Sequence, residues 1–445
     1  MNTTLKRILK PLVTPQTLIM YHWSRAAVGN LVFGFPSRGM LVIGITGTKG
    51  KTTSCHFLAS ILEEAGFRVG MATTVNFKIA GKEEVNNTNM SVTAPFALQR
   101  LLRKMRTAKC DVVILEVTSI ALDQFRTLGI PFRYVGLTNI THDHLDYHKT
   151  WKNYQMSKLK LFLGRRQMAT VNLDDPSAEL FLTKTTATEK WGYTTLDTQV
   201  KYERLRAESI LDTSFQLCIE EQSVPVSLHL PGRFSIENAL CAGSLALALG
   251  VSLRGVAIGL SKLERVAGRL EMIAAPSGFS VMVDYAHTPD SLEKLYATLR
   301  PSIPGRMIAV LGATGDRDTT KRPIMGALAA RFCDLVFITD EEPYTEDPIA
   351  IIEEIAAGVP RGRALFKASA AVHRENHPKI KALTSSGFGE WWWKITDRRA
   401  AITAAISVAQ PGDLILVTGM GAQNFRKVGN KKEPWNDRQV IESLL

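Results

Sequence analysis

The sequence lacks any run of eighteen uncharged apolar residues, and no signal-peptide cleavage pattern follows its N-terminus. A transmembrane helix needs about 20 consecutive, mostly apolar residues, so the chain is not predicted to span a membrane. Low-complexity tracts and internal repeats are absent too, while 45% of the residues are apolar and 22% are charged. This composition is typical of a globular chain, and 445 residues are enough for two or three domains.

Cysteines are few, and none of them forms a C-x-x-C pair. The five are Cys55, Cys110, Cys218, Cys241 and Cys333. Such scattered cysteines suit a protein of the reducing cytoplasm.

The formal charge of +12 could indicate a nucleic-acid partner. The basic residues are dispersed, however, and are not gathered in one stripe with interleaved aromatic residues. We therefore expect no nucleic-acid partner, because anionic nucleotide-type substrates account for the charge equally well.

Acidic residues are missing from residues 1–38, which we interpret as a separate N-terminal segment. Its basic residues are Lys6, Arg7, Lys10, Arg25 and Arg38. Apolar clusters lie at Leu18 to Met20 and Leu31 to Phe35. The segment could be amphipathic and lie on an anionic membrane surface. The commoner alternative is that it packs onto its own domain.

The stretch from Met40 to Thr53, MLVIGITGTKGKTT, carries the strongest functional pattern. The apolar, β-branched run Leu41 to Ile45 predicts a buried strand, and a glycine-rich turn then opens onto a helix. Gly47 and Gly50 let the backbone approach phosphate oxygens, and the free N–H groups of the helix N-terminus face the same place. Lys51 adds a cation for the terminal phosphates, and Thr52 would ligate Mg²⁺. The alternative is a glycine-rich turn that binds no nucleotide.

The spacing of this turn differs from that of the common P-loop, because Gly47 lies only three residues before Gly50. The variant TGTKGKTT resembles the signature of the Mur ligase family, which also contains folylpolyglutamate synthase. The resemblance implies an ATP site. Its residues would be Gly47, Thr48, Lys49, Gly50, Lys51, Thr52 and Thr53.

Residues 39–265 alternate predicted strands and helices, which is typical of a doubly wound parallel sheet. The clearest further strands are Asp111 to Val117, Tyr134 to Asn139 and Met168 to Asn172. Ligands gather at the carboxyl ends of such strands. Residues 196–230 read as an antiparallel excursion.

Residues 266–445 predict a second, Rossmann-like α/β domain. Its strands are expected at Ser280 to Asp284, Met307 to Gly312, Asp334 to Thr339 and Asp413 to Thr418. The segment Glu375 to Trp393, which carries glycines, serines and three tryptophans, is predicted to be a surface excursion.

Glu116 ends an apolar strand, where a carboxylate would be costly unless a partner satisfied it. A Mg²⁺ ion would do so. Downstream, TNITHDHLDYH places His142, His144 and His148 within seven residues. A zinc site and a solvated loop are both alternatives for this cluster, although the cysteines that usually join zinc clusters are absent.

The run TNITHDHLDYHKTWKNYQMSKLKLF resembles the Mur ligase segment in which a histidine joins the glutamate on a second magnesium ion. The resemblance assigns these roles to His144 and Glu116. It also places Lys158 at the lysine that the family carbamylates, which would give an anionic ligand beside the metal. The alternative for Lys158 is a plain surface lysine.

Further motifs resemble the family in chain order. The resemblance implies that Asn238 in GRFSIENAL contacts adenine, that Arg269 in VAGRLE lies at the domain junction, and that Asp316 and Arg317 approach ribose and phosphates. The stretches VDYAHTPDSLEKL and GDRDTTKRPIMG are similar to the UDP-N-acetylmuramoyl-tripeptide synthetase branch. The substrate residues that the resemblance implies are Thr93, Asp340, Glu341, Glu342, Pro343, Tyr344, Gly419 and Gln423.

Three departures from that branch are visible. A separate UDP-binding domain is expected before the glycine-rich turn, where this sequence has the segment 1–38. The amino-acid-selecting motif Asp-Asn-Pro-Arg reads Asp340 to Tyr344, DEEPY, and the selecting arginine is gone. Its companion, usually Gly-Lys-Gly-His-Glu, reads Gly419 to Gln423, GMGAQ. We therefore expect an amino acid with a basic or neutral side chain, unless those acids are solvated and selection lies elsewhere.

Together these features predict a multidomain α/β protein with a P-loop-containing central domain and a Rossmann-like C-terminal domain. The expected activity is ATP-dependent amide ligation on a cell-wall precursor by a cytoplasmic monomer, with ATP and two Mg²⁺ ions. Alternatives within the family are a folylpolyglutamate synthase and a lipid-linked wall-precursor amidase subunit. From another class, a nucleotide-dependent binding protein without turnover stays open, although Lys51, Glu116, His144 and Lys158 argue against it.

Overall fold

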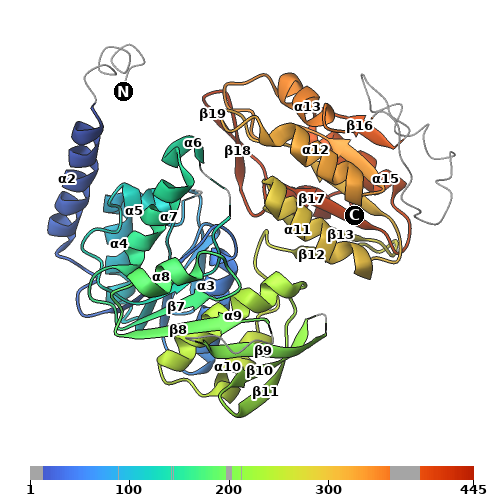
Figure 1. The fold of residues 1–445 in the computed structure, drawn as a ribbon. Coiled ribbons are helices and arrows are strands. Elements are labelled where there is room, and N and C mark those ends of the chain that lie inside the picture. Colours follow the sequence, from blue (N-terminus) through green and yellow to red (C-terminus); the bar gives the residue numbers. More distant parts are fainter. Residues whose placement is uncertain are drawn as a thin grey trace. The chain divides into compact units, whose positions relative to one another are not determined.

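The computed structural model describes residues 14–88, 90–141, 143, 145–196, 203–211, 213–360 and 391–445. They form two compact units (Figure 1). The first unit comprises residues up to His229 together with Arg233–Glu264, and the second comprises Leu230–Gly232 and Arg265–Leu445. Each unit contains its own sheet.

The first unit is built on an eleven-stranded sheet of order β11-β10-β9-β8-β7-β6-β1-β5-β2-β3-β4. The seven central strands, which are β9, β8, β7, β6, β1, β5 and β2, pair in parallel. The strands β3 and β4 at one end of the sheet and β10 and β11 at the other end pair in antiparallel fashion. Their bounds are β1 Leu41–Thr46, β2 Val69–Ala72, β3 Asn76–Ile79, β4 Lys82–Val85, β5 Val112–Glu116, β6 Phe132–Leu137, β7 Met168–Asn172, β8 Glu189–Thr194, β9 Glu203–Leu211, β10 Ser214–Ile219 and β11 Gln222–Ser227.

Ten helical segments accompany the sheet of this unit within the described residues. They are α2 Pro15–Phe33, α3 Lys51–Glu64, α4 Pro95–Thr107, α5 Ser119–Asp123, α6 Leu145–His148, α7 Trp151–Leu159, the 3₁₀ helix Lys160–Phe162, α8 Ala178–Lys184, α9 Arg233–Ala248 and α10 Leu253–Ser261. Among the described helices, none has both the length and the apolar character that crossing a bilayer requires.

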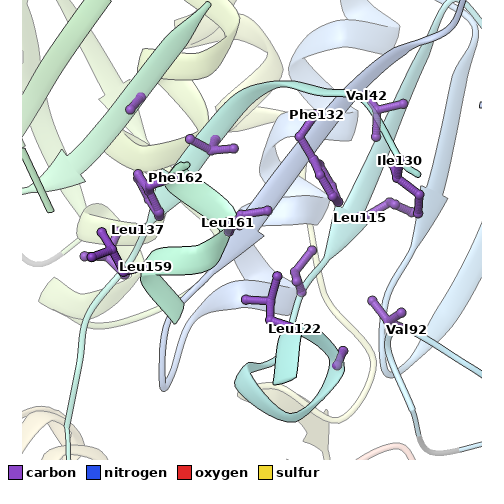
Figure 2. Packing of buried hydrophobic residues seen from close by; sticks show 14 of the residues in the cluster. Val42, Val92, Leu115, Leu122, Ile130, Phe132, Leu137, Leu159, Leu161 and Phe162 are labelled. Atoms are coloured by element: carbon purple, nitrogen blue, oxygen red, sulfur yellow. The ribbon is translucent and has the colours of Figure 1, made fainter. Parts of the chain in front are cut away.

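A buried apolar cluster lies against β1, β5 and β6, and Figure 2 shows Leu115, Phe132 and Leu161 gathered beside these strands. The packing reaches the β1 backbone. A Cβ on Gly44 would lie 2.8 Å from Phe132 Cδ1 and 3.0 Å from Leu161 Cδ1, so only glycine fits there without displacement. Atoms in such a densely packed interior have little room to move. Packing therefore fixes the position of the strand that leads into the glycine-rich turn.

The second unit is built on a six-stranded sheet of order β12-β13-β17-β14-β15-β16. β12 is antiparallel to β13, and the other neighbours pair in parallel. A separate hairpin, β18 with β19, follows β17. The bounds are β12 Glu271–Ala274, β13 Ser280–Asp284, α11 Pro289–Leu299, a 3₁₀ helix Arg300–Ser302, β14 Met307–Leu311, α12 Lys321–Phe332, β15 Leu335–Ile338, α13 Pro348–Ala356, β16 Trp392–Lys394, α15 Arg398–Val408, β17 Leu414–Thr418, β18 Phe425–Val428, β19 Lys431–Pro434 and α16 Asp437–Glu442.

The α/β class, the two parallel-dominated sheets and the antiparallel excursion were expected from the sequence and are confirmed. The surface excursion predicted for Glu375 to Trp393 is wrong at its C-terminal end. Trp391 and Trp393 are buried, and Trp393 stacks on Phe337 with ring centroids 4.8 Å apart, so β16 completes the sheet edge. The rest of that segment, up to residue 390, lies outside the described residues.

Candidate functional site: a phosphate cradle

The glycine-rich turn joins β1 to α3, which begins at Lys51. Gly47 has φ 151° and Gly50 has φ 81°, values that favour glycine. A Cβ on Gly47 would lie 1.9 Å from Thr138 Oγ1, and one on Gly50 would lie 1.9 Å from Asn238 Oδ1. Both glycines are therefore required by close approach as well as by backbone conformation. The predicted adenine residue Asn238 lies directly beside the turn.

The carboxyl end of β6 holds this turn in place. Thr138 Oγ1 donates a hydrogen bond to the Lys49 carbonyl (2.6 Å), and Asn139 Oδ1 accepts one from the Lys49 N–H (2.9 Å). The Thr48 N–H donates to the Asn139 carbonyl (2.8 Å), and the Thr48 and Tyr154 hydroxyl oxygens lie 2.8 Å apart. These contacts occur because β6 is the parallel neighbour of β1.

Glu116 lies at the carboxyl end of β5, opposite Ile45 of β1 in the sheet register. It is only 2% exposed. Thr52 Oγ1 donates to its Oε2 (3.0 Å), and Thr74 donates to it through both its N–H and its hydroxyl group (2.8 Å each). Sequence reasoning missed Thr74, because nothing in the residues around it signals a contact 42 positions away.

The oxygen atoms at Glu116 and Thr52 are suitable ligands for a magnesium ion. Its three hydrogen-bond donors, from Thr52 and Thr74, are neutral groups, so a cation would complete the compensation of a buried carboxylate. A hydroxyl and a carboxylate oxygen are the hard ligands that Mg²⁺ prefers. Within the described ranges, no group of three or more His, Cys, Asp or Glu residues is placed so that it could hold a metal ion.

Lys158 lies on α7 and is buried, at 2% exposure. Its Nζ donates to the Gly47 carbonyl (2.6 Å) and lies 4.6 Å from the centre of the Tyr154 ring. Burial, followed by the nearby positive charge of Lys51, lowers the pKa of Lys158 well below its usual value. The alternative of a plain surface lysine is therefore wrong.

Two further lysines belong to the turn. Lys51 Nζ donates to the Thr48 carbonyl (2.7 Å) and stays partly exposed at the start of α3. Lys49 pairs with Asp143, with 3.5 Å between Nζ and Oδ2. Lys51, Lys158 and Glu116 therefore lie around one short loop.

The histidine cluster is described only in part. His142 and His144 lie outside the described residues. His148 is buried at the end of α6, and its Nε2 lies 3.0 Å from Ser119 Oγ. The role of His144 beside Glu116 stays a prediction.

In the second unit, Arg317 contacts Tyr344, and Asp316 contacts Thr345. The Arg317 guanidinium lies 5.5 Å from the centre of the Tyr344 ring, and Thr345 Oγ1 donates to Asp316 Oδ1 (2.8 Å). Arg269 packs over the Tyr285 ring at 4.4 Å.

The carboxylates of the Asp340 to Tyr344 loop are buried, with exposures of 3 to 8% for the three acids, so they are not solvated. Thr314 Oγ1 donates to Glu341 Oε1 (2.7 Å), while Glu341 Oε2 has no hydrogen-bond partner among the described residues. The Lys427 N–H donates to Glu342 Oε1 (3.2 Å), and Arg426 lies 3.3 Å from Asp340. Burial, together with the neighbouring Glu341, raises the pKa of Glu342 to about 7.

Of the remaining predicted substrate residues, Thr93 lies in the first unit, and Pro343, Gly419 and Gln423 lie in the second. A Cβ on Gly419 would come within 2.1 Å of Glu341 Oε2, so this glycine allows the close approach of the acid. Pro343 lies next in the same loop, and its carbonyl accepts from the Glu346 N–H (3.0 Å). Thr93 is in the first unit and is buried. The buried oxygens Thr93 Oγ1 and Gln423 Oε1 have no partner within the described residues.

The parallel sheet, the glycine-rich turn and the cluster of Lys51, Glu116 and Lys158 define a phosphate-binding α/β enzyme of the P-loop type. The Mur ligase middle domain matches residues 45–246, and the Mur ligase glutamate ligase domain matches residues 268–421. The chain belongs to the Mur ligase family.

Similar proteins extend over nearly the whole chain. A UDP-N-acetylmuramyl-tripeptide synthetase of Roseiflexus sp. is 36% identical over 93% of this chain and 80% of its own length. A UDP-N-acetylmuramoyl-L-alanyl-D-glutamate–2,6-diaminopimelate ligase of Clostridium botulinum is 34% identical over 96% and 83%.

Solved structures of other proteins share the fold of this chain. A structure of a ligase of the latter name has a TM-score of 0.60 and 27% identity over 91% of this chain and 78% of its own. A bifunctional folylpolyglutamate synthase/dihydrofolate synthase from Yersinia pestis shares the fold, with a TM-score of 0.64 and 19% identity over 89% of this chain and 90% of its own. This chain is an ATP-dependent, ADP-forming acid–amino-acid ligase.

Proposed function

We propose that the protein adds an amino acid to a peptide carboxylate of a UDP-N-acetylmuramoyl-peptide-like precursor in the cytoplasm. The observation that carries this proposal is the placement of Lys51, Glu116 and buried Lys158 around the cradle. The 36% and 34% identical relatives named as tripeptide synthetase and diaminopimelate ligase support the acceptor class.

The reaction follows from these groups. The acceptor carboxylate attacks the γ-phosphorus of ATP, the bond to the β,γ-bridging oxygen breaks, and an acyl phosphate and ADP form. Lys51 stabilises the negative charge that develops on the phosphoryl oxygens. The incoming amine then attacks the acyl carbon, loses a proton and expels phosphate, which leaves an amide.

Thr52 and Glu116 are the residues that would hold magnesium, and His144 would join Glu116 on a second ion. Bound magnesium would neutralise phosphate charge and fix the phosphate geometry. Glu116 is itself oriented by Thr52 and Thr74, so its carboxylate presents a fixed edge to the cradle.

Lys158 would act as a carbamate. Its lowered pKa favours the neutral amine, whose lone pair can form an N–C bond to carbon dioxide while a C=O electron pair moves to oxygen and Nζ releases a proton. The resulting carbamate is anionic, which suits a position beside Lys51 and the magnesium ligands. In the described structure Nζ contacts the Gly47 carbonyl, so the side chain already reaches the cradle.

The second unit would select the amino acid through Asp340 to Tyr344. Arginine pairs bidentately with a distal carboxylate, and this loop offers buried acids instead. The unpartnered Glu341 Oε2 and the raised pKa of Glu342 both favour a nearby cationic group. We therefore infer that lysine or ornithine is preferred over diaminopimelate.

A phosphate-release screen would test the proposed function. Wall-precursor peptides and folates are offered as acceptors with lysine, ornithine, alanine and diaminopimelate in one competition, and products are identified by mass. We expect ATP-dependent ligation of a basic amino acid to the wall precursor. Ligation to folate alone would reject the acceptor, and preference for diaminopimelate would reject the charge argument.

A further inference from the structure

Helix α2, Pro15–Phe33, exposes an apolar stripe. Met20, Tyr21, Val28, Leu31 and Val32 are each between 46 and 69% exposed. At about 100° of rotation per residue these five positions fall within about 120° of the helix circumference, so they share one face of the helix. Large apolar side chains gathered on one exposed face are unusual on a folded surface and indicate a binding surface.

The opposite face of α2 fixes the direction of this stripe. Asn30 Nδ2 donates to the Leu128 carbonyl (2.8 Å), and Phe33 meets Phe96 of α4 edge to face, with ring centroids 6.5 Å apart. A Cβ on Gly29 would lie 3.6 Å from the Pro95 backbone, in ordinary contact. Figure 1 shows α2 at the edge of the first unit, beside α4. The stripe therefore points away from the unit that the helix packs against.

Basic residues accompany the stripe. On α4 and just beyond it, the exposed residues Arg100, Arg103, Lys104, Arg106 and Lys109 form no ion pair with any described residue. Residues 1–38 add five basic side chains and no acid. Exposed apolar side chains and uncompensated positive charge thus occur together on neighbouring helices.

We propose that α2 and the basic side of α4 form a docking surface for an anionic lipid bilayer, with the α2 stripe inserted at the headgroup boundary. Apolar burial and attraction to anionic headgroups act together at such surfaces. Tyr21, a half-exposed member of the stripe, has an amphipathic ring of the kind that favours this boundary. A second copy of the chain fits the surface less well, because it would bring the same positive charge against this one.

Co-sedimentation of the full chain with vesicles tests this proposal. Pure phosphatidylcholine vesicles are compared with vesicles that contain 30 mol% phosphatidylglycerol, at two salt concentrations. We expect binding only to the anionic vesicles, with weaker binding at high salt. Leu31→Glu should remove most of the binding. Arg103→Glu with Lys104→Glu should weaken it by about 25-fold, from about fivefold for each basic residue lost.

Matched controls separate this surface from the general charge of +12. Ile258→Glu changes a partly exposed apolar residue on α10, and Lys184→Glu with Arg254→Glu makes the same charge change on α8 and α10. These variants should bind vesicles as the unaltered protein does, and all variants should keep phosphate release with a water-soluble acceptor. The proposal is overturned if the unaltered protein fails to bind, if the controls lose binding equally, or if Leu31→Glu abolishes a dimer in sedimentation velocity while leaving vesicle binding unchanged.

Discussion

Lys158 is buried in a place that disfavours an ammonium group. Its burial and the positive charge of Lys51 both destabilise the protonated form and lower its pKa. Lys158→Ala should lower kcat by about 100-fold or more, since an oriented electrostatic group is lost. Acetate should restore part of the activity, and ¹³C NMR in labelled bicarbonate should show a carbamate signal that the variant lacks. Lys160→Ala is the matched control, because Lys160 is exposed and pairs with Asp123. Full activity of Lys158→Ala would remove Lys158 from the mechanism.

Lys51 makes a different contribution at the same site, because it stays partly exposed at the start of α3 and donates to the Thr48 carbonyl of the turn. Lys51→Ala should therefore leave the fold intact while phosphate release falls by about 10² to 10³-fold. Circular dichroism and thermal unfolding would check the fold, with exposed Lys184→Ala as the control. Substrate-stimulated ATP hydrolysis at the normal rate would contradict the assignment of the cradle.

The raised pKa of Glu342 predicts that the stability of the fold depends on pH. Its pKa in the folded chain is raised to about 7 from 4.5, so between these values the folded state binds more protons than the unfolded state. The free energy of unfolding should therefore fall as pH rises from about 4.5 to about 7. Glu342→Gln should flatten this part of the profile, measured by urea unfolding at fixed ionic strength. An identical slope in the variant would show that other groups cause it, and Asp340 and Glu341, whose pKa values are also raised, would be the next to replace.

The turn between β1 and α3 depends on glycine for two separable reasons. Gly50 and Gly66 both have positive φ, 81° and 88°, but only Gly50 would bring a Cβ against Asn238, since nothing lies within 4 Å of a Cβ on Gly66. Gly66→Ala should cost about 1 kcal/mol of stability and leave ATP affinity unchanged. Gly50→Ala should lose ATP affinity by at least about tenfold, measured by calorimetry, because Asn238 must move. Equal effects would mean that the backbone conformation alone requires glycine.

The parts of the chain that could be predicted are those where local sequence and topology agree. The β1 turn and Glu116 were predicted because the turn has a motif and the strand ends of a doubly wound sheet converge, whereas Lys158 was predicted only through the resemblance to the Mur ligase family. Thr74 could not be predicted, since its contact with Glu116 arises only when β2 and β5 pair. The buried Trp393 was missed because flanking glycines and serines suggested a loop, whereas stacking on Phe337 decides its place.

The two units have separate sheets and separate buried cores. Domains with their own cores can unfold as separate cooperative units. Differential scanning calorimetry should therefore show two transitions. Mg-ATP at about 100 times its Kd should stabilise the unit that holds the cradle by about 2.7 kcal/mol, and should move the other transition less.

Trp393→Ala should act on the other transition. The residue is buried at 3% exposure and stacks on Phe337 in the second unit, so its truncation should cost about 3 to 5 kcal/mol there. The transition that Mg-ATP raises should keep its midpoint in this variant, because the cradle and its core belong to the first unit. Ile324→Ala is the control, since that apolar side chain is half exposed on α12 and should cost little. A single transition that moves with both Mg-ATP and Trp393→Ala would show that the two units unfold together, and a shift of only the second unit's transition by Mg-ATP would place the nucleotide away from the β1 turn.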